Sequence, residues 1–200
     1  MGNSIIENVN VYYGRIQGTD NIGGLVGSTT SSNTISDSSF KDGEISAKGV
    51  SGGIIGYSTG VNLLRVASSG SLRYNGEYSN IAGDFGGLIG KAETTLSISQ
   101  SYSDMNVMAN NSVGGLVGTA LAGTISDSYS TGDLFTWGGL YPHLGGIVGW
   151  GGPLTLSNTF HTMGGLSSDY PSANIGALVG SAYATVNCNQ HYTCIRMLSL

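Results

Sequence analysis

Glycine-rich apolar blocks recur along the whole chain at nearly equal intervals. The first block runs from Ile22 to Gly27 and reads Ile-Gly-Gly-Leu-Val-Gly. Close copies occupy residues 51–56, 85–90, 113–118, 144–149 and 175–180, and the steps between their first glycines are 29, 34, 28, 31 and 31 residues. A second apolar series has the same period and comprises Ile6, Ile35, Leu64, Ile98, Ile125, Leu156 and Val186. Two series that share one period of about 30 residues predict a repeat architecture.

Each repeat is predicted to form short strands rather than helices. The position of Val26 holds Val or Ile in all six blocks, and β-branched side chains pack well on a pleated surface. The Gly-Gly-Leu-Val-Gly sequence is a poor helix, because each glycine costs about 1 kcal/mol there relative to alanine. Residues 34–38 and 124–128 are further predicted strands, and a third strand is expected around Ile45 and Leu134. One repeat is therefore a coil of two or three strands.

A single coil of this kind cannot bury its apolar face, but stacked coils can. Parallel pairing of each strand with its copies, about 4.8 Å away, turns the apolar series into a continuous core. We therefore predict an all-β fold, a parallel β-solenoid of six to seven coils of about 30 residues each. Val26 then lies beside Ile55, and Ile98 beside Ile125. Residues 1–186 form the solenoid, and residues 187–200, which leave the pattern, form a C-terminal cap.

The paired glycines of the blocks are predicted to be structural. Positions without a side chain let another layer of the chain approach the backbone closely, or let the chain bend sharply at positive φ. These glycines are Gly23, Gly24, Gly52, Gly53, Gly86, Gly87, Gly114, Gly115, Gly145, Gly146 and Gly176. Ala177 replaces the second glycine in the last block, where an end coil has less to pack against.

Residues 113–134 carry a recognisable motif. Val-Gly-Gly-Leu-Val-Gly at residues 113–118 is followed from Thr124 to Leu134 by Thr-Ile-Ser-Asp-Ser-Tyr-Ser-Thr-Gly-Asp-Leu. This pattern resembles the GLUG-motif repeat, and the resemblance extends over nearly the whole chain. It implies secreted or surface-anchored bacterial proteins, often large and adhesin-like, with the repeats as a β-solenoid stalk or binding module. The family has no agreed catalytic residues, so the resemblance implies none here.

Composition and charge narrow the classes of partner. The 200 residues include 34 Gly, only 10% are charged, and the net charge is −5. No Lys or Arg lies between Lys91 and Arg196, so this half cannot hold a phosphate or sulfate through a basic side chain, and no nucleic-acid partner is expected. No apolar run approaches the roughly 20 residues of a membrane helix, so the chain is not expected to be membrane-embedded. The start of the chain lacks a signal-peptide pattern, and we interpret it as a piece of a longer secreted protein.

The sequence offers little for catalysis. The three histidines are widely spaced, and no Gly-x-Ser-x-Gly motif accompanies them. Asp37 and Asp127 share a place in the repeat, but three coils, about 14 Å, separate them, which is too far for a carboxylate pair. We therefore expect no enzyme, no cofactor and no metal site. Cys188 and Cys194 form either a disulfide that closes a small loop near the chain end or two separate thiols.

Aromatic residues gather where the repeat varies most. The connection between the third strand and the next glycine pair is short at residues 48–51 and long at residues 135–143. Because these insertions occur at one point of the repeat, they should project from one edge of the rod, where repeat proteins often bind. The candidate ligand-binding residues are Tyr74, Tyr78, Phe135, Trp137, Tyr141, Trp150 and Tyr170. The alternative is that these loops fold back and cover an open edge of the solenoid.

Another aromatic series recurs within the strands. Tyr102, Tyr129 and Phe160 occupy one place in successive repeats. We interpret them as a structural stack of rings at the coil spacing, and the alternative is an exposed stripe for ligand stacking.

Together these features predict a noncatalytic extracellular domain of an adhesin or fibre that binds a cell-surface glycan or protein through the aromatic loops. A structural spacer without a ligand is the first alternative, and a glycan-cleaving β-helix enzyme is the second. The partial coil at residues 4–9 and the predicted cap suggest the outer tip of a longer parent chain, through which the protein can form a homo-oligomer.

Overall fold

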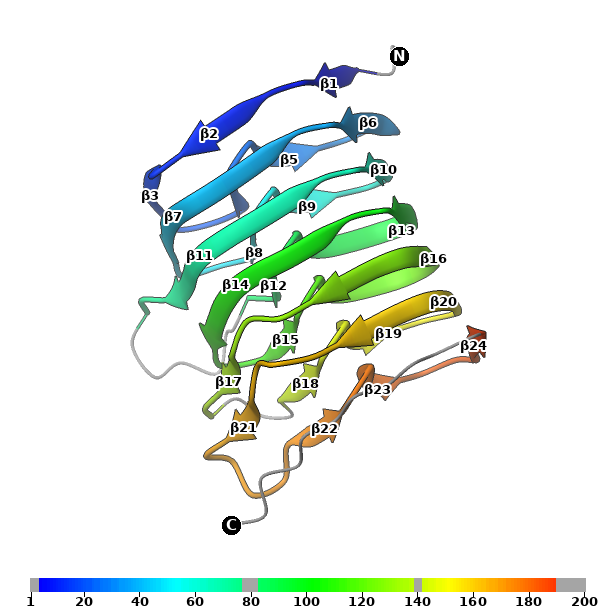
Figure 1. Ribbon diagram of the computed structural model, residues 1–200. Coiled ribbons are helices and arrows are strands. Elements are labelled where there is room, and N and C mark those ends of the chain that lie inside the picture. Colours follow the sequence, from blue (N-terminus) through cyan, green and yellow to red (C-terminus); the bar gives the residue numbers. More distant parts are fainter. Residues whose placement is uncertain (1–3, 77–82, 139–141, 190–200) are drawn as a thin grey trace.

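The chain folds as a rod of stacked coils. The computed structural model describes residues 4–76, 83–138 and 142–189. Over these residues the chain forms strands and turns without a helix. The strands pair in parallel and stack as a β-solenoid of about six turns, with successive turns about 31 residues apart (Figure 1). This confirms the fold that the sequence predicts.

Each turn passes through four ladders of strands, of which three belong to one 18-stranded sheet. The ladder that we call wall 1 contains β1 (Ile5–Glu7), β6 (Asn33–Ser36), β10 (Val61–Leu64), the end of β13 (Ile89–Ser99), the middle of β16 (Val117–Ser130), the start of β20 (Leu154–His161) and β24 (Val186–Asn189). Wall 2 follows it and contains the ends of β16 and β20 with β2 (Asn10–Tyr12), β3 (Arg15–Gly18), β7 (Ser39–Ala47), β11 (Ala67–Tyr74), β14 (Tyr102–Ala109), β17 (Leu134–Thr136) and β21 (Leu166–Ser168).

The glycine blocks supply the other two ladders. A separate six-stranded sheet, here the glycine ladder, contains β4 (Ile22–Gly23), β8 (Ser51–Gly52), β12 (Phe85–Gly86), β15 (Ser112–Gly114), β18 (His143–Gly145) and β22 (Asn174–Gly176). Wall 3 completes the turn and contains the starts of β13 and β16 with β5 (Val26–Thr29), β9 (Ile55–Ser58), β19 (Val148–Gly151) and β23 (Val179–Ala182).

The register confirms the predicted neighbours and corrects two assignments. Val26 pairs with Ile55, and Ile98 pairs with Ile125, as predicted. In the second turn Leu63, rather than Leu64, pairs with both Ile35 and Ile98, because side chains alternate along a strand and Leu64 points outward.

At the C-terminal end the second apolar series continues through Cys188. Cys188 pairs with Leu156, whereas Val186 pairs with Leu154 in the neighbouring inward column. The assignment of Val186 to the column of Ile125 was therefore wrong by two residues. The predicted cap at residues 187–200 lies outside the described residues from position 190 onward.

A left-handed residue turns the chain from wall 1 into wall 2 in each coil. The residues at this corner have φ of about 48–57° and are Asn8, Asp37, Arg65, Gln100, Asp127 and Asn158. Asn and Asp tolerate this conformation better than most residues, since their short polar side chains can bond locally. Arg65 donates two hydrogen bonds to the Asp37 carboxylate, with Nε–Oδ1 and Nη2–Oδ2 distances of 2.5 and 2.6 Å. This exposed contact lowers the pKa of Asp37 through the hydrogen bond from Arg65.

The paired glycines form an arch between the glycine ladder and wall 3. A Cβ on the first glycine, Gly114, would lie 1.8 Å from the carbonyl oxygen of Val117. A Cβ on the second, Gly115, would lie 2.0 Å from the carbonyl oxygen of Gly146 and 2.3 Å from Oγ of Ser130 on wall 2. No paired glycine of the six blocks has a positive φ. Close approach therefore explains these glycines, and the alternative of a bend at positive φ was wrong.

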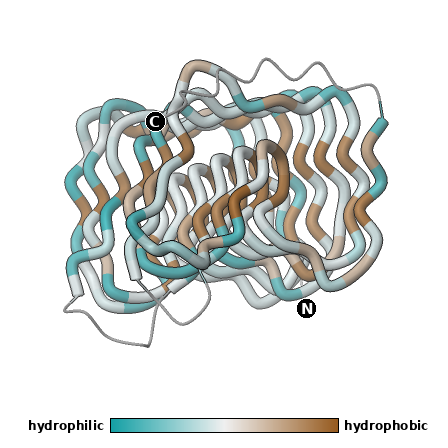
Figure 2. Tube along the Cα trace, turned by 90° about the horizontal axis from the view of Figure 1, so that it is seen from below, coloured by the Kyte–Doolittle hydropathy of each residue, from teal (hydrophilic) through white to brown (hydrophobic). Residues whose placement is uncertain are grey.

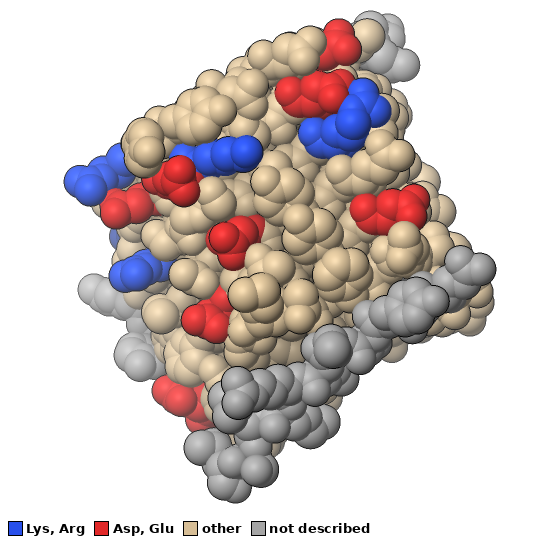
Figure 3. All heavy atoms as spheres, in the orientation of Figure 1, with Lys and Arg blue, Asp and Glu red and all other residues tan. Residues whose placement is uncertain are grey.

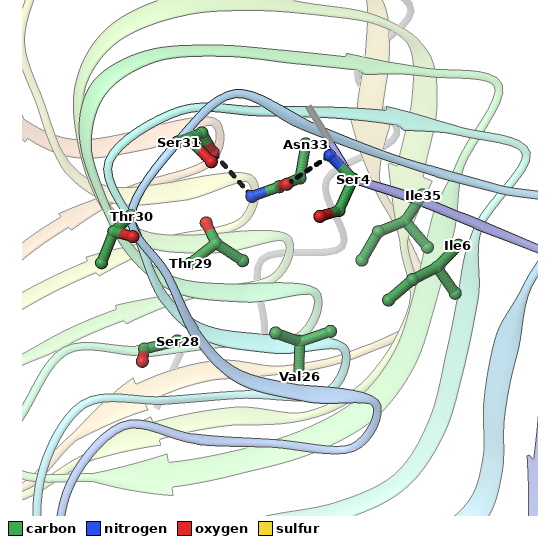
Figure 4. A pocket seen from close by; sticks show the side chains of 9 residues that line it. All are labelled: Ser4, Ile6, Val26, Ser28, Thr29, Thr30, Ser31, Asn33 and Ile35. Atoms are coloured by element: carbon green, nitrogen blue, oxygen red, sulfur yellow. Dashed lines mark hydrogen bonds between the residues drawn. The ribbon is translucent and has the colours of Figure 1, made fainter. Parts of the chain in front are cut away.

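The arch carries apolar side chains to both sides of the coil interior. Phe85 of the glycine ladder packs edge to face on Tyr74 of wall 2, with ring centroids 6.1 Å apart. Val26 of wall 3 instead lines a cavity of about 260 Å³ together with Ile6 and Ile35 of wall 1 at the N-terminal end of the stack (Figure 4). Figure 2 shows the resulting columns of apolar residues along the stack. Every coil therefore contributes to one continuous core.

The tips of three successive arches meet serines of wall 2, whereas the first arch meets Phe40 in the same column. Ser68 donates a hydrogen bond of 2.6 Å to the carbonyl of Gly87, and Ser130 donates one of 2.5 Å to the carbonyl of Gly146. His161 continues this column, with Nδ1 2.9 Å from Oγ of Ser130 and Nε2 3.0 Å from the carbonyl oxygen of Gly164. Burial is the main cause that lowers the pKa of His161 below its ordinary value.

Replacing the second glycine of an arch should destabilise the fold. Gly115→Ala places a methyl group against the Gly146 carbonyl and Ser130, and we expect the free energy of unfolding to fall by roughly 1–3 kcal/mol. Gly165→Ala is the matched control, since the nearest atom to its Cβ would be Oδ1 of Asp133 at 3.6 Å. Urea unfolding followed by circular dichroism measures both variants. Equal stability of the two variants would contradict the role of close approach.

Protonation of His161 should weaken the fold. The pKa of His161 is lowered in the folded chain, so the unfolded chain binds the proton first as the pH falls. The contribution of neutral His161 to the free energy of unfolding is therefore complete above about pH 6.5 and declines below that pH. His161→Ser restores the residue type of Ser68, Ser103 and Ser130 in this column. When the pH falls from 7.5 to 5, we expect the wild type to lose more unfolding free energy than His161→Ser does. A difference that stays constant over this range would refute the assignment.

Candidate functional site

The variable connections leave the solenoid at one edge, which we call the loop edge. In each coil the connection runs from the end of wall 2 to the start of the glycine ladder, as after β7, β11, β14, β17 and β21. Figure 1 places the described ends of these connections along the same side of the stack. The repeat predicts this arrangement, because an insertion at one point of every coil has one location on the rod.

Three of the predicted ring residues meet at the loop edge. The rings of Tyr74 and Trp137 are 6.2 Å apart and inclined at 63°, and Phe135 stacks on Trp137 at 5.9 Å. Tyr74 is 8% exposed, and Trp137 packs partly against the core. Phe135 pairs with Met108, which is 39% exposed, in an outward column of wall 2. Tyr74 thus serves packing, while Phe135 and Trp137 retain exposed ring surface.

The other predicted ring residues do not join this cluster, although Tyr170 also lies in a loop-edge connection. Tyr170 is half-buried in the connection after β21, where its N–H donates to Oγ of Ser168 at 3.0 Å. Tyr78 and Tyr141 lie outside the described residues. Trp150 belongs to β19 in wall 3, so it lies within a strand rather than in a variable connection. Trp150 was assigned to the loop edge because it follows the 135–143 connection closely in sequence, and that assignment was wrong.

Trp150 has an aromatic partner that the sequence did not indicate. The ring centroids of Trp150 and Tyr183 are 4.8 Å apart and the rings are inclined at 32°. The hydroxyl of Tyr183 donates a 3.0 Å hydrogen bond to the carbonyl of Leu121, which lies 62 residues earlier in the chain. Tyr183 is nonetheless 54% exposed. The pair is therefore a fixed aromatic surface at the end of wall 3.

Wall 3 also carries a polar network. The hydroxyl of Tyr57 donates a 2.5 Å hydrogen bond to Oε2 of Glu93, and Nζ of Lys91 lies 2.9 Å from Oε1 of the same carboxylate. The hydrogen bond from Tyr57 is the main cause that lowers the pKa of Glu93. Sequence reasoning missed this network, although Tyr57, Lys91 and Trp150 each follow the third glycine of a block. That shared position is the signal that could have found it.

The carboxyl of Asp84 lies near Lys91 of this network, and its pKa is shifted in the opposite direction to that of Glu93. Burial is the main cause that raises the pKa of Asp84, and the positive charge of Lys91 partly offsets it. Asn111 also donates a 3.3 Å hydrogen bond to Oδ1 of Asp84. Lys91 thus acts on two carboxyls, the half-buried Asp84 and the accessible Glu93.

The rings of Tyr102, Tyr129 and Phe160 form the predicted stack. Their centroid separations are 5.2 and 5.1 Å, with interplanar angles of 5° and 3°. Each ring face inside the stack is covered by its neighbour, and burial raises the pKa of Tyr129. The stack leaves ring edges rather than ring faces for a ligand, which favours the structural interpretation.

The remaining chemical groups give little sign of a metal or redox site. Cys188 lies exposed in β24, and Cys194 lies outside the described residues, so the disulfide stays a prediction. His143 contacts Asn174, with 3.2 Å between Nδ1 and Nδ2. Over residues 4–76, 83–138 and 142–189, no three His, Cys, Asp or Glu residues are grouped as a metal would need. The same residues include no helix that could cross a membrane.

Comparison with known proteins identifies the repeat. A family model described as the GLUG motif matches residues 109–134, which hold β15, β16 and the first residue of β17. No match was found among curated proteins. The matched segment contains one glycine arch and its passage through wall 3, wall 1 and the corner to wall 2. The chain therefore contains a GLUG motif at residues 109–134, and this motif folds as most of one turn of a parallel β-solenoid.

Proposed function

We propose that this chain is a noncatalytic binding module of an extracellular adhesin or fibre, and that it recognises a glycan or protein on a cell surface through the loop edge. The observation that supports the proposal most is the convergence of all variable connections on one edge, next to the half-buried rings of Phe135 and Trp137. Variation confined to one edge of a regular rod is typical of a repeat protein that binds there.

The chemistry of the loop edge fits recognition by contact rather than by charge. Phe135, Trp137 and Met108 offer apolar surface, and flat rings give a large contact area at a low cost in conformational entropy. Tyr74 fixes Trp137 from below, which keeps the ring in place before a ligand arrives. Preorganisation of this kind raises affinity because less freedom is lost on binding.

The spacer remains the competing function. The stack of identical coils is a stiff support, and the rings at the loop edge also cover the end of the core. A spacer of this kind needs no ligand, so wild-type binding separates the two functions.

Removal of the exposed rings should abolish recognition without unfolding the rod. For Phe135→Ala combined with Trp137→Ala, we expect affinity for target cells, or for the best ligand on a glycan array, to fall at least about tenfold. Tyr12→Ala is the matched control, since Tyr12 is 56% exposed at the N-terminal end of the stack. Circular dichroism checks the fold of each variant. Unchanged binding by the folded double variant would reject the loop edge, and a wild type that binds neither cells nor glycans would favour the spacer.

A further inference from the structure

One column of wall 3 combines the polar network with the aromatic pair. The residue that follows the third glycine is Tyr57 in β9, Lys91 in β13, Thr119 in β16 and Trp150 in β19, and these residues pair in register along the stack. Neighbours in such a column are about 4.8 Å apart, so Lys91 and Trp150 are separated by about 10 Å along the axis. We call this column, together with Glu93 and Tyr183, the wall 3 strip.

The polar half of the strip can bond to hydroxyl groups. Lys91 and Glu93 are held together by their ion pair, yet their side chains remain 29% and 39% exposed. The ammonium group has three donors and the carboxylate several acceptor positions, so both keep capacity beyond their mutual contact and the bond from Tyr57. A donor and an acceptor fixed side by side suit the hydroxyls of a sugar.

The aromatic half of the strip offers a stacking surface. Tyr183 donates a hydrogen bond to the carbonyl of Leu121 and packs against Trp150, so its ring is held by contacts to two other coils. Unlike the rings of Tyr102 and Tyr129, this pair does not continue into a longer ring stack within the described residues. A flat sugar face can therefore pack on it.

Charge in and around the strip favours a neutral ligand. Lys91 is already paired with Glu93, and no Lys or Arg follows it before Arg196. Figure 3 shows the same imbalance on the opposite side of the rod, where basic residues lie over the N-terminal coils and only acidic ones over the later coils. The basic group of the strip is thus already engaged, and an anionic chain would gain little from it.

We propose that the wall 3 strip binds an extended neutral glycan that lies parallel to the stack, with one sugar on the Trp150–Tyr183 pair and another bonded to Lys91, Glu93 and Tyr57. This inference rests on the proposed function as a binding module, but it places the glycan on wall 3 rather than at the loop edge. Because the coils repeat along the axis, a longer glycan contacts more of them, and affinity should rise with chain length.

Calorimetric titration of the whole chain with defined hexasaccharides tests the strip. Cellohexaose and chitohexaose serve as neutral probes, and a hyaluronan hexasaccharide serves as the anionic probe. We expect binding of at least one neutral probe, a roughly tenfold loss of affinity in Trp150→Ala, and a smaller loss in Tyr183→Phe, which removes only the hydroxyl bonded to Leu121. Glu93→Gln should also weaken binding, because it breaks the network with Lys91 and Tyr57.

The loop edge provides the matched control. Trp137→Ala, with its fold checked by circular dichroism, should leave affinity for the neutral hexasaccharide within about twofold. The strip is rejected if neither neutral probe binds, if hyaluronan binds more tightly, or if Trp137→Ala weakens binding as much as Trp150→Ala does. Cell binding that depends on Trp137 would then still support the loop edge, so the two proposals fail separately.

Discussion

Close backbone approach at the glycine arches is the constraint on which the rest of the structure depends. At each arch a Cβ on the first glycine would overlap a carbonyl of its own turn, and in the five arches before the last a Cβ on the second glycine would overlap both the next arch and wall 2. In those arches the glycine ladder can stay inside the coil only because two adjacent positions lack side chains, whereas the last arch, which no further described arch follows, accepts Ala177 at the second position. Once the ladder is inside, apolar residues such as Phe85 and Val26 reach opposite halves of the core. The glycines thus determine how much core a coil of about 31 residues can enclose.

This constraint sorts positions by their freedom to vary. Most inward columns keep apolar residues from coil to coil, because each side chain packs on its own copies above and below, although Phe40 pairs with Ser68 in one buried column. The left-handed corner accepts several polar residues, and even Arg65 fits there beside Asp37. Outward positions are not restricted by packing between coils, and they include the connections at the loop edge and the residue after the third glycine. Both of our binding proposals rest on these two places.

The fold could be predicted well from the sequence because aligned copies of a repeat show which residues pair between neighbouring coils. Six copies of one block identify which residues touch, so the pairing of Val26 with Ile55 followed without any structural information. The error at Leu64 arose where two leucines are adjacent, since either one satisfies an apolar period. The corner residue would have settled the choice, but Arg65 stands where other turns have Asn, Asp or Gln and thus concealed the alignment. Periodicity alone therefore specifies a register to within one residue at Leu64 and to within two at Val186.

The candidate sites were less predictable, because they depend on contacts that break the repeat. Tyr183 reaches a carbonyl in a coil 62 residues earlier, and no periodic rule anticipates that bond. Trp137 turns inward onto Tyr74, although its place in a long connection suggested an exposed ring. Apart from such a bond, a coil of a solenoid contacts its two neighbours, so most outward substitutions in one coil disturb two interfaces at most. Recognition residues can then diversify on the rod while its core stays constant, which is why ligand chemistry has to be determined from outward positions one coil at a time.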